Sequence, residues 1–221
     1  MKVALSPKTM RKNKIIQAAL SIFAEKGFQD STIAEISKLA EVSEATVYEY
    51  FKTKEDLLFA IPEEITEEAF KEWEKVLPYI RGIENKIRAM VQGYMNLYQN
   101  NPSYSALIML QLKNNRNFLK TDAYKLIQHI ARMLLNLIQE GVNNGIFKKD
   151  IDPYLVRAMI LGTIEHLCIR WHLLGEPANL LEQVDPLVEV ILSGIKVETQ
   201  QKFVCPYLTF NPDSSQTDKT D

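Results

Sequence analysis

Apolar residues recur every three or four positions along most of the chain, which is the spacing of one face of an α-helix. Gly27, Gly145 and Gly175 stand where this spacing stops, as glycine often does at the end of a helix. No stretch shows the convincing alternation of apolar and polar residues that is typical of a half-buried strand. The pattern therefore predicts an all-α fold, with helices over about 10–27, 33–41, 43–51, 54–77, 83–99, 102–113, 122–144 and 153–174, and a last one within 180–197.

Two short segments near the N-terminus begin with strong capping signals. Thr32 and Glu35 have the spacing of a capping box, and Ser43 is a favourable N-cap for the segment that follows it. Val47 and Phe51 lie four residues apart, so both fall on one face of this second segment and can be buried. A helix this short is not stable alone and must pack on a support. Two short helices joined by a tight turn predict a helix-turn-helix whose second helix enters the DNA major groove.

The next predicted helix is capped by Thr53 and carries Lys54 in its first turn. A lysine is unfavourable there because of the helix dipole, unless an anion lies close to it. A DNA phosphate is one such anion, and the backbone amides of Ser43 and Lys54 are predicted phosphate sites. Several cations precede the first acidic residue, which favours phosphate contact over the alternative of a solvated terminus. They are Lys2, Lys8, Arg11, Lys12 and Lys14.

The 221 residues, 46% of them hydrophobic, suffice for a sizeable core and two domains. The net charge of −2 does not indicate a nucleic-acid partner, so the distribution of charge matters more. The N-terminus does not resemble a signal peptide, and the most apolar stretch, residues 155–174, is interrupted by charged residues and histidines. A cytoplasmic protein with no membrane partner is expected, and Cys168 and Cys205 are too few for a disulfide framework.

Chemistry other than DNA binding has few candidates. Cys168 and His172 lie four residues apart on one helix face, with His166 nearby, but a zinc ion needs three or four ligands. No titratable pair stands beside an evident nucleophile or a glycine-rich loop. The chain is therefore expected to bind no metal or cofactor and not to be an enzyme.

The run from Ala40 to Leu57 resembles the DNA-binding domain of the tetracycline-repressor (TetR) family. The stretch from Ala18 through Phe23 to Phe28, followed by Thr32, Ile33 and Ile36, is similar to the first two helices of that domain. The resemblance implies a three-helix DNA-binding domain over residues 1–53, a helical effector-binding and dimerisation domain over 54–198 and a tail over 199–221. It also implies a homodimeric regulator, usually a repressor, that binds a palindromic operator and is released by a small hydrophobic effector.

The resemblance places the DNA contacts mainly on the helix that follows Ser43. Ala45 is small enough to approach a thymine methyl group, while the hydroxyl groups of this helix can donate to phosphates. Glu44 and Glu49 stand where the family often has basic or polar residues, and a carboxylate can accept from cytosine N4. We predict that one of them reads cytosine; the alternative is that both face solvent and only tune affinity. The predicted DNA-binding set is Thr32, Ser43, Glu44, Ala45, Thr46, Tyr48, Glu49, Tyr50 and Lys54.

Residues 141–153 and 162–167 are similar to TetR-type regulators of fatty-acid degradation, which respond to long-chain acyl-CoA. This resemblance implies a long-chain acyl-CoA effector for this chain. Helix position and side-chain size alone suggest the pocket residues Tyr94, Met109, Met133 and Trp171.

Two further features and two alternatives stay open at this point. Pro62 predicts either a kink, which would be a hinge, or the start of a new helix. The apolar cluster 203–210 is expected to dock on the body or on a partner subunit. The chain could also be a constitutive DNA-binding protein without a ligand, or a helical interaction module that has lost DNA binding.

Overall fold

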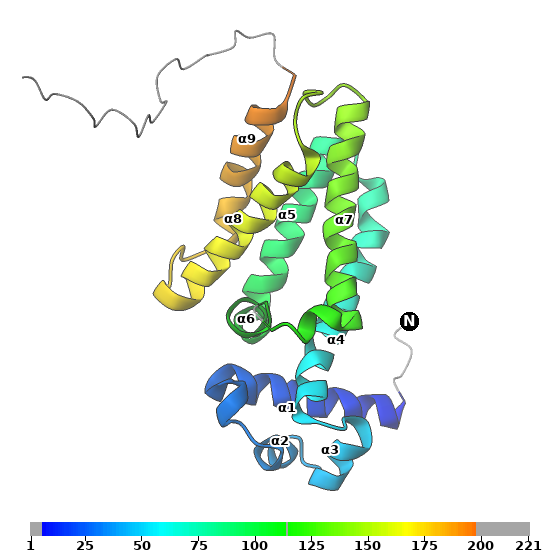
Figure 1. Cartoon of the computed structure of the whole chain (residues 1–221), viewed down its shortest axis with the longest axis vertical. Coiled ribbons are helices and arrows are strands. Elements are labelled where there is room, and N and C mark those ends of the chain that lie inside the picture. Colours follow the sequence, from blue (N-terminus) through cyan, green and yellow to red (C-terminus); the bar gives the residue numbers. More distant parts are fainter. Residues whose placement is uncertain (1–5, 114, 198–221) are drawn as a thin grey trace, which may run out of the picture.

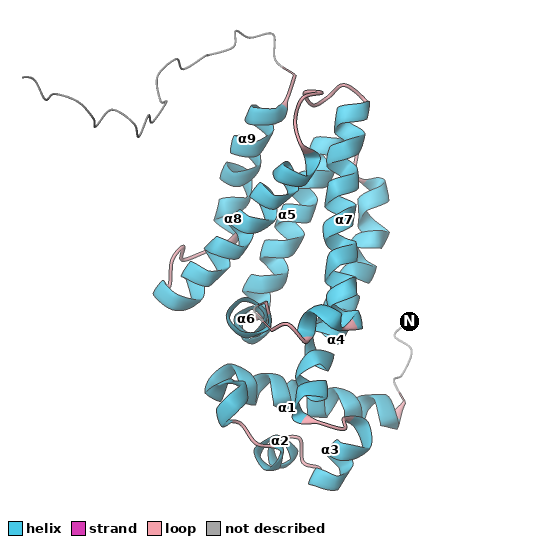
Figure 2. Ribbon diagram, in the orientation of Figure 1, coloured by secondary structure: helices cyan, strands magenta, loops and turns pink. Residues whose placement is uncertain are grey.

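The computed structural model describes residues 6–113 and 115–197, and the prediction of an all-α fold is confirmed (Figure 2). The first three helices form a small bundle, and α4 leads from it into a larger bundle made by the later helices (Figure 1). The helices are α1 (Pro7–Asp30), α2 (Ile33–Leu39), α3 (Glu44–Tyr50), α4 (Lys54–Val76), α5 (Ile83–Asn100), α6 (Pro102–Ala106), α7 (Asp122–Asn143), α8 (Pro153–Leu174) and α9 (Val184–Ile195). The predicted docking of residues 203–210 and the predicted phosphate contact of Lys2 lie outside the described residues.

The predicted caps of the two short helices are present. The amide of Glu35 donates to Thr32 Oγ1 over 3.2 Å, and the Glu35 carboxylate accepts from the Thr32 amide over 3.0 Å, which completes the capping box of α2. Ser43 Oγ accepts from the Thr46 amide over 3.1 Å at the start of α3. Val47 and Phe51 are buried. The small apolar face of α3 is therefore held by packing, as its length requires.

The ammonium group of Lys54 already has hydrogen-bond acceptors within the protein, and phosphate contact by the Lys54 backbone amide remains a prediction. Lys54 Nζ donates to the carbonyl oxygens of Phe28 at 2.6 Å and Ser31 at 2.8 Å, and more weakly to that of Gln29 at 3.3 Å. It also lies 4.5 Å from the centroid of the Phe28 ring. These carbonyls belong to the C-terminal end of α1, which carries partial negative charge and lacks intrahelical donors.

The structure decides between the alternatives at Pro62 and shows how α6 starts. Helix α4 runs without interruption through the buried Pro62, so no new helix starts there. Helix α6 starts at Pro102, as the predicted range requires, but the Asn101 side chain makes no capping hydrogen bond; its amide nitrogen donates to the carbonyl oxygen of Leu97 over 2.9 Å. The other predicted boundaries in this half agree closely with the structure: Asp152 caps α8, and Gly175, in the left-handed region at φ 71°, ends it.

The predicted single helix over 102–113 has two parts. Helix α6 ends at Ala106 and continues as a π-helix over Leu107–Leu112. A π-helix is rare and is found disproportionately at functional sites. This one lies between the two bundles, because it contacts both α1 and α8.

Replacing Lys54 by Met should lower the free energy of unfolding by about 1.5–3 kcal/mol, because hydrogen bonds from a charged donor to the end of α1 are lost. Urea denaturation followed by circular dichroism measures the change. Lys52→Met is the matched control, since Lys52 is exposed in the adjacent turn. Equal stability of the two variants would contradict the structural role of Lys54.

Candidate DNA-binding surface and effector pocket

Helix α3 exposes a polar face at the end of the molecule that is remote from the larger bundle (Figure 1). Ser43, Glu44, Ala45 and Glu49 are exposed, and Tyr48 is 51% exposed. Small side chains flanked by hydrogen-bonding groups suit close approach to base edges and phosphates. This exposed face weighs against an interaction module that has lost DNA binding, although Glu44 remains an acidic residue on it.

Three other residues of the predicted DNA-binding set already have partners within the protein. The Thr46 hydroxyl lies 2.9 Å from Ser43 Oγ, and Thr32 is engaged in the capping box of α2. The Tyr50 hydroxyl donates to the carbonyl oxygen of Lys8 over 3.3 Å, which connects α3 to the start of α1. Contact of these side chains with DNA remains a prediction.

Glu49 lies in a cleft with two cations of α1. The cleft has a volume of about 370 Å³ and is lined by Pro7, Lys8, Arg11, Glu49 and Tyr50. The positive charges of Lys8 and Arg11 offset the carboxylate of Glu49, so this acid repels phosphates less than an isolated one would. Glu44 is exposed and is not among the residues that line this cleft.

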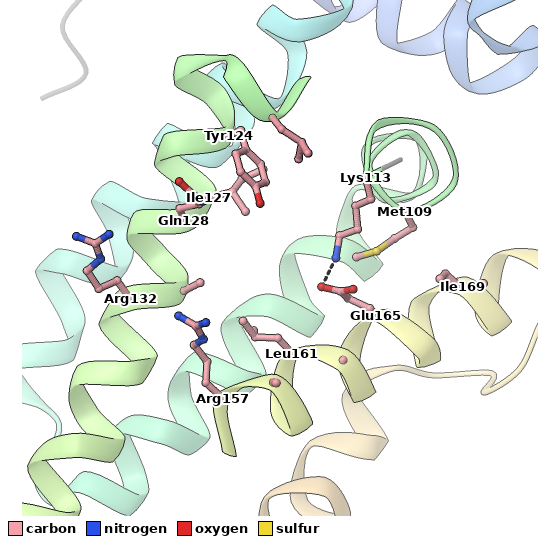
Figure 3. A pocket seen from close by; sticks show the side chains of 14 residues that line it. Met109, Lys113, Tyr124, Ile127, Gln128, Arg132, Arg157, Leu161, Glu165 and Ile169 are labelled. Atoms are coloured by element: carbon pink, nitrogen blue, oxygen red, sulfur yellow. Dashed lines mark ion pairs between the residues drawn. The ribbon is translucent and has the colours of Figure 1, made fainter. Parts of the chain in front are cut away.

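A hollow of about 730 Å³ lies between α7 and α8 and is bordered at one end by the π-helix (Figure 3). Arg132 of α7 and Arg157 of α8 lie at one side of it, and an ion pair between Lys113 and Glu165 lies toward the π-helix (Figure 3). Leu161 and Ile127 contribute apolar wall. The hollow therefore combines cations with an apolar lining.

A smaller inner pocket of about 60 Å³ adjoins this hollow. The two share Lys113, Tyr124, Leu161 and Glu165 among their lining residues. The inner pocket reaches Tyr94 and Tyr98 of α5, which are buried. The two together are called the cavity below: a wide outer hollow and a narrow inner pocket with part of their walls in common.

The structure separates the four predicted pocket residues into two pairs. Tyr94 lines the inner pocket and Met109 lines the outer hollow. Met133 and Trp171 line neither, because Met133 packs against the core and the Trp171 ring lies 4.8 Å from that of His172. A role of Met133 or Trp171 in ligand binding remains a prediction that this cavity does not support. Arg157 and Glu165 were missed, although they interrupt the apolar run 155–174 and that interruption was a usable signal.

The residues considered for metal binding have other surroundings. His172 Nε2 lies 2.9 Å from Ser105 Oγ, and burial lowers the pKa of His172. Burial raises the pKa of the Cys168 thiol to about 12, which keeps it protonated and a poor metal ligand. Within residues 6–113 and 115–197, no three His, Cys, Asp or Glu side chains are grouped so that they could hold a metal ion. No helix in the same ranges is both long and apolar enough to cross a membrane.

Two family models match nearly the whole described chain. Residues 15–61 match that of the "Bacterial regulatory proteins, tetR family", and residues 64–194 match that of the "YsiA-like protein, C-terminal region". The chain belongs to the TetR family. It is therefore a ligand-responsive DNA-binding transcriptional regulator, in a family of regulators and not of enzymes.

Similar TetR-family proteins include repressors and regulators of lipid metabolism. The "Fatty acid metabolism regulator protein" of Bacillus subtilis is 26% identical over 189 residues, which cover 86% of this chain and 96% of that protein. The repressor KstR2 of Mycolicibacterium smegmatis is 22% identical, with 84% and 90% covered. The crystal structure of the regulator FadR from Bacillus subtilis in complex with stearoyl-CoA superposes with a TM-score of 0.77 at 26% identity, covering 83% of this chain and 98% of that one.

The π-helix and the segment after it contact α1 and the start of α4 through polar side chains near the cavity. Gln111 of the π-helix donates from Nε2 to the carbonyl oxygen of Phe23 in α1 over 3.3 Å. Asn117 Nδ2 lies 3.3 Å from the Glu55 carboxylate in the first turn of α4. Met109 and Lys113 flank Gln111 and line the hollow, so one segment borders both the cavity and α1.

Of the two acids on α3, Glu44 is expected to specify a base and Glu49 is not. Selection of operator DNA from random duplexes should show that Glu44→Gln loses a preference for cytosine, by about 1–3 kcal/mol at that position. Glu49→Gln should keep the base preference and bind all duplexes more tightly, because a negative charge is removed near phosphates. An unchanged preference in Glu44→Gln would eliminate the cytosine contact.

Proposed function

We propose that this chain is a cytoplasmic repressor that binds a palindromic operator as a homodimer and is released by an acyl-CoA thioester. The observation that carries the effector class is the cavity, which places cations beside an apolar interior. Coenzyme A carries phosphates at one end and its acyl group at the other, so a ligand of this class needs both kinds of surface. A similar protein of known structure is in complex with stearoyl-CoA.

Arg132 and Arg157 are the proposed phosphate ligands. Guanidinium groups bind phosphate through paired hydrogen bonds, and they are weakly hydrated compared with lysine. The two come from different helices and face the same hollow (Figure 3). The hollow also weighs against a constitutive regulator, whose effector domain would need no cavity of several hundred Å³.

The proposed dimer contact is the outer face of α8 and α9. Leu155 and Met159 of α8 lie one turn apart and are 59% and 50% exposed, and Val190 of α9 is 70% exposed. Further apolar side chains at the end of α8, Leu173 and Leu174, are also exposed. Contiguous exposed apolar side chains are typical of an interface, because a monomer would leave them in water.

The purified full-length protein should select a palindrome from random duplex DNA at fixed salt, and stearoyl-CoA should release it from that DNA. Recovery of an enriched palindrome is expected from two identical recognition helices related by a two-fold axis. If no sequence is enriched, the proposal of a sequence-specific regulator fails. If a palindrome is enriched but no CoA thioester releases the protein from it, the proposed effector class fails.

The variants Arg132→Gln and Arg157→Gln should each raise the CoA-thioester concentration for half-maximal release by about tenfold or more, because a charge-assisted hydrogen bond is lost. Lys125→Gln is the matched control on α7: its ammonium group lies outside the hollow, beside Asp122 at 2.8 Å. Operator affinity without effector should be the same in all three variants.

A charge on the outer face of α9 should break the dimer. Val190→Asp places a carboxylate where the proposed interface excludes water, so sedimentation should show a monomer with operator affinity reduced at least about a hundredfold. The neighbouring exposed Glu189→Gln serves as the control. A Val190→Asp protein that sediments as the wild type does would place the interface elsewhere.

A further inference from the structure

The inner end of the cavity presents the hydroxyl groups of two tyrosines that are only 7% and 8% exposed, Tyr94 and Tyr98. Neither hydroxyl has a hydrogen bond to another residue in the described part of the chain, where every fully buried side-chain nitrogen or oxygen atom has a partner, so both hydroxyls are accessible atoms of residues that line the pocket. Tyr104 differs: its ring stacks on that of Tyr98 at 6.3 Å, but its hydroxyl lies 2.7 Å from the Thr66 hydroxyl. The fold therefore satisfies Tyr104 internally and leaves the other two hydroxyls to the occupant of the pocket.

These hydroxyls are donors at any physiological pH. Burial raises the pKa of Tyr94 and of Tyr98 far above neutrality, so both keep their protons. A buried donor that faces a saturated chain has lost its hydrogen bonds to water and gained none, which disfavours such a ligand. An oxygen atom at the buried end of the ligand would accept from them.

The size and walls of the inner pocket favour a compact group. Its volume of about 60 Å³ holds roughly four to six water-sized groups, which matches one ring and is far smaller than a long chain. Phe118 and Tyr124 add two aromatic walls, and their rings meet edge to face at 5.8 Å. Aromatic walls offer flat contact area to a ring.

The passage into the inner pocket is polar as well. Lys113 and Glu165 form an ion pair and line both the outer hollow and the inner pocket, so they stand where the two meet (Figure 3). A pocket built only for a saturated chain has no use for an ammonium, a carboxylate and two unpaired hydroxyls along its path.

We propose that the acyl part of the effector ends in an oxygen-bearing ring, whose oxygen accepts hydrogen bonds from Tyr94 and Tyr98 in the inner pocket. This inference rests on the proposed acyl-CoA response and narrows its ligand class. A straight saturated acyl chain such as the stearoyl group is then the weaker effector of this protein.

The test compares CoA thioesters with short ring-bearing, short straight and long straight acyl groups in release of the full-length protein from its selected operator. The probes are 3-(4-hydroxyphenyl)propanoyl-CoA, its 3-hydroxyphenyl isomer, 3-phenylpropanoyl-CoA, octanoyl-CoA and stearoyl-CoA. At least one hydroxylated ring should act at a concentration about tenfold lower than the unsubstituted ring and the straight chains. Straight chains that act at equal or lower concentrations than every ring would overturn the inference and leave the acyl-CoA response standing.

Phenylalanine variants assign the effect to the two hydroxyls. Tyr94→Phe and Tyr98→Phe should each reduce the advantage of the hydroxylated ring to about twofold, while responses to octanoyl-CoA stay equal or improve. Tyr104→Phe is the matched control: it removes a buried hydroxyl that is paired with Thr66, so it should lower stability and keep the advantage. An advantage undiminished in Tyr94→Phe and Tyr98→Phe would overturn the inference, and failure of every CoA thioester to release DNA would overturn the proposed function with it.

Discussion

The hydrogen bonds of Lys54 fix the end of α1 to the start of α4. Its backbone belongs to the first turn of α4, and its ammonium group holds the carbonyl oxygens at the end of α1. Helices α2 and α3 have only seven residues each and depend on their neighbours for stability: α2 packs on α1, and α3 packs on α2. The recognition helix α3 is therefore positioned through α2 by α1, and a change in the angle between α1 and α4 would move these three helices together.

The cavity can influence that junction because the π-helix borders both. Gln111 contacts the Phe23 carbonyl of α1, while its neighbours Met109 and Lys113 line the hollow. A ligand that requires more room between α7, α8 and the π-helix would alter this contact directly. The ligand shifts the equilibrium only by the difference in its affinity for the two arrangements, so tight binding alone would not release DNA.

Features that depend on neighbours in sequence were predictable, and features that depend on distant partners were not. The caps at Thr32, Ser43 and Thr53 use bonds three residues apart, and each is present as predicted. The hydrogen-bond acceptors of the Lys54 side chain lie more than twenty residues away along the chain, so the sequence around Lys54 did not reveal them.

The cavity also depends on distant partners and was only partly predictable. Its walls come from α5, α7, α8 and the π-helix, and their relative rotation is set by packing across the bundle. Tyr94 and Met109 could be chosen as large residues on inward faces, yet Met133 and Trp171 met that criterion equally well and turn elsewhere. Nothing in the spacing of residues 107–112 distinguishes a π-helix from an α-helix, so this segment could not be predicted from periodicity.

The buried hydrogen bond between Thr66 and Tyr104 fixes the middle of α4 in the larger bundle, so a rotation of α4 about this point displaces its N-terminal end. Thr66 is fixed inside the larger bundle, and Lys54 lies twelve residues away along an uninterrupted helix, which is about 18 Å at 1.5 Å per residue. A rotation of about 5° around Thr66 moves the Lys54 end by roughly 1.5 Å. Hydrogen bonds weaken steeply over such a displacement. A rotation of a few degrees is therefore large enough to weaken hydrogen bonds between the recognition helix and a phosphate backbone.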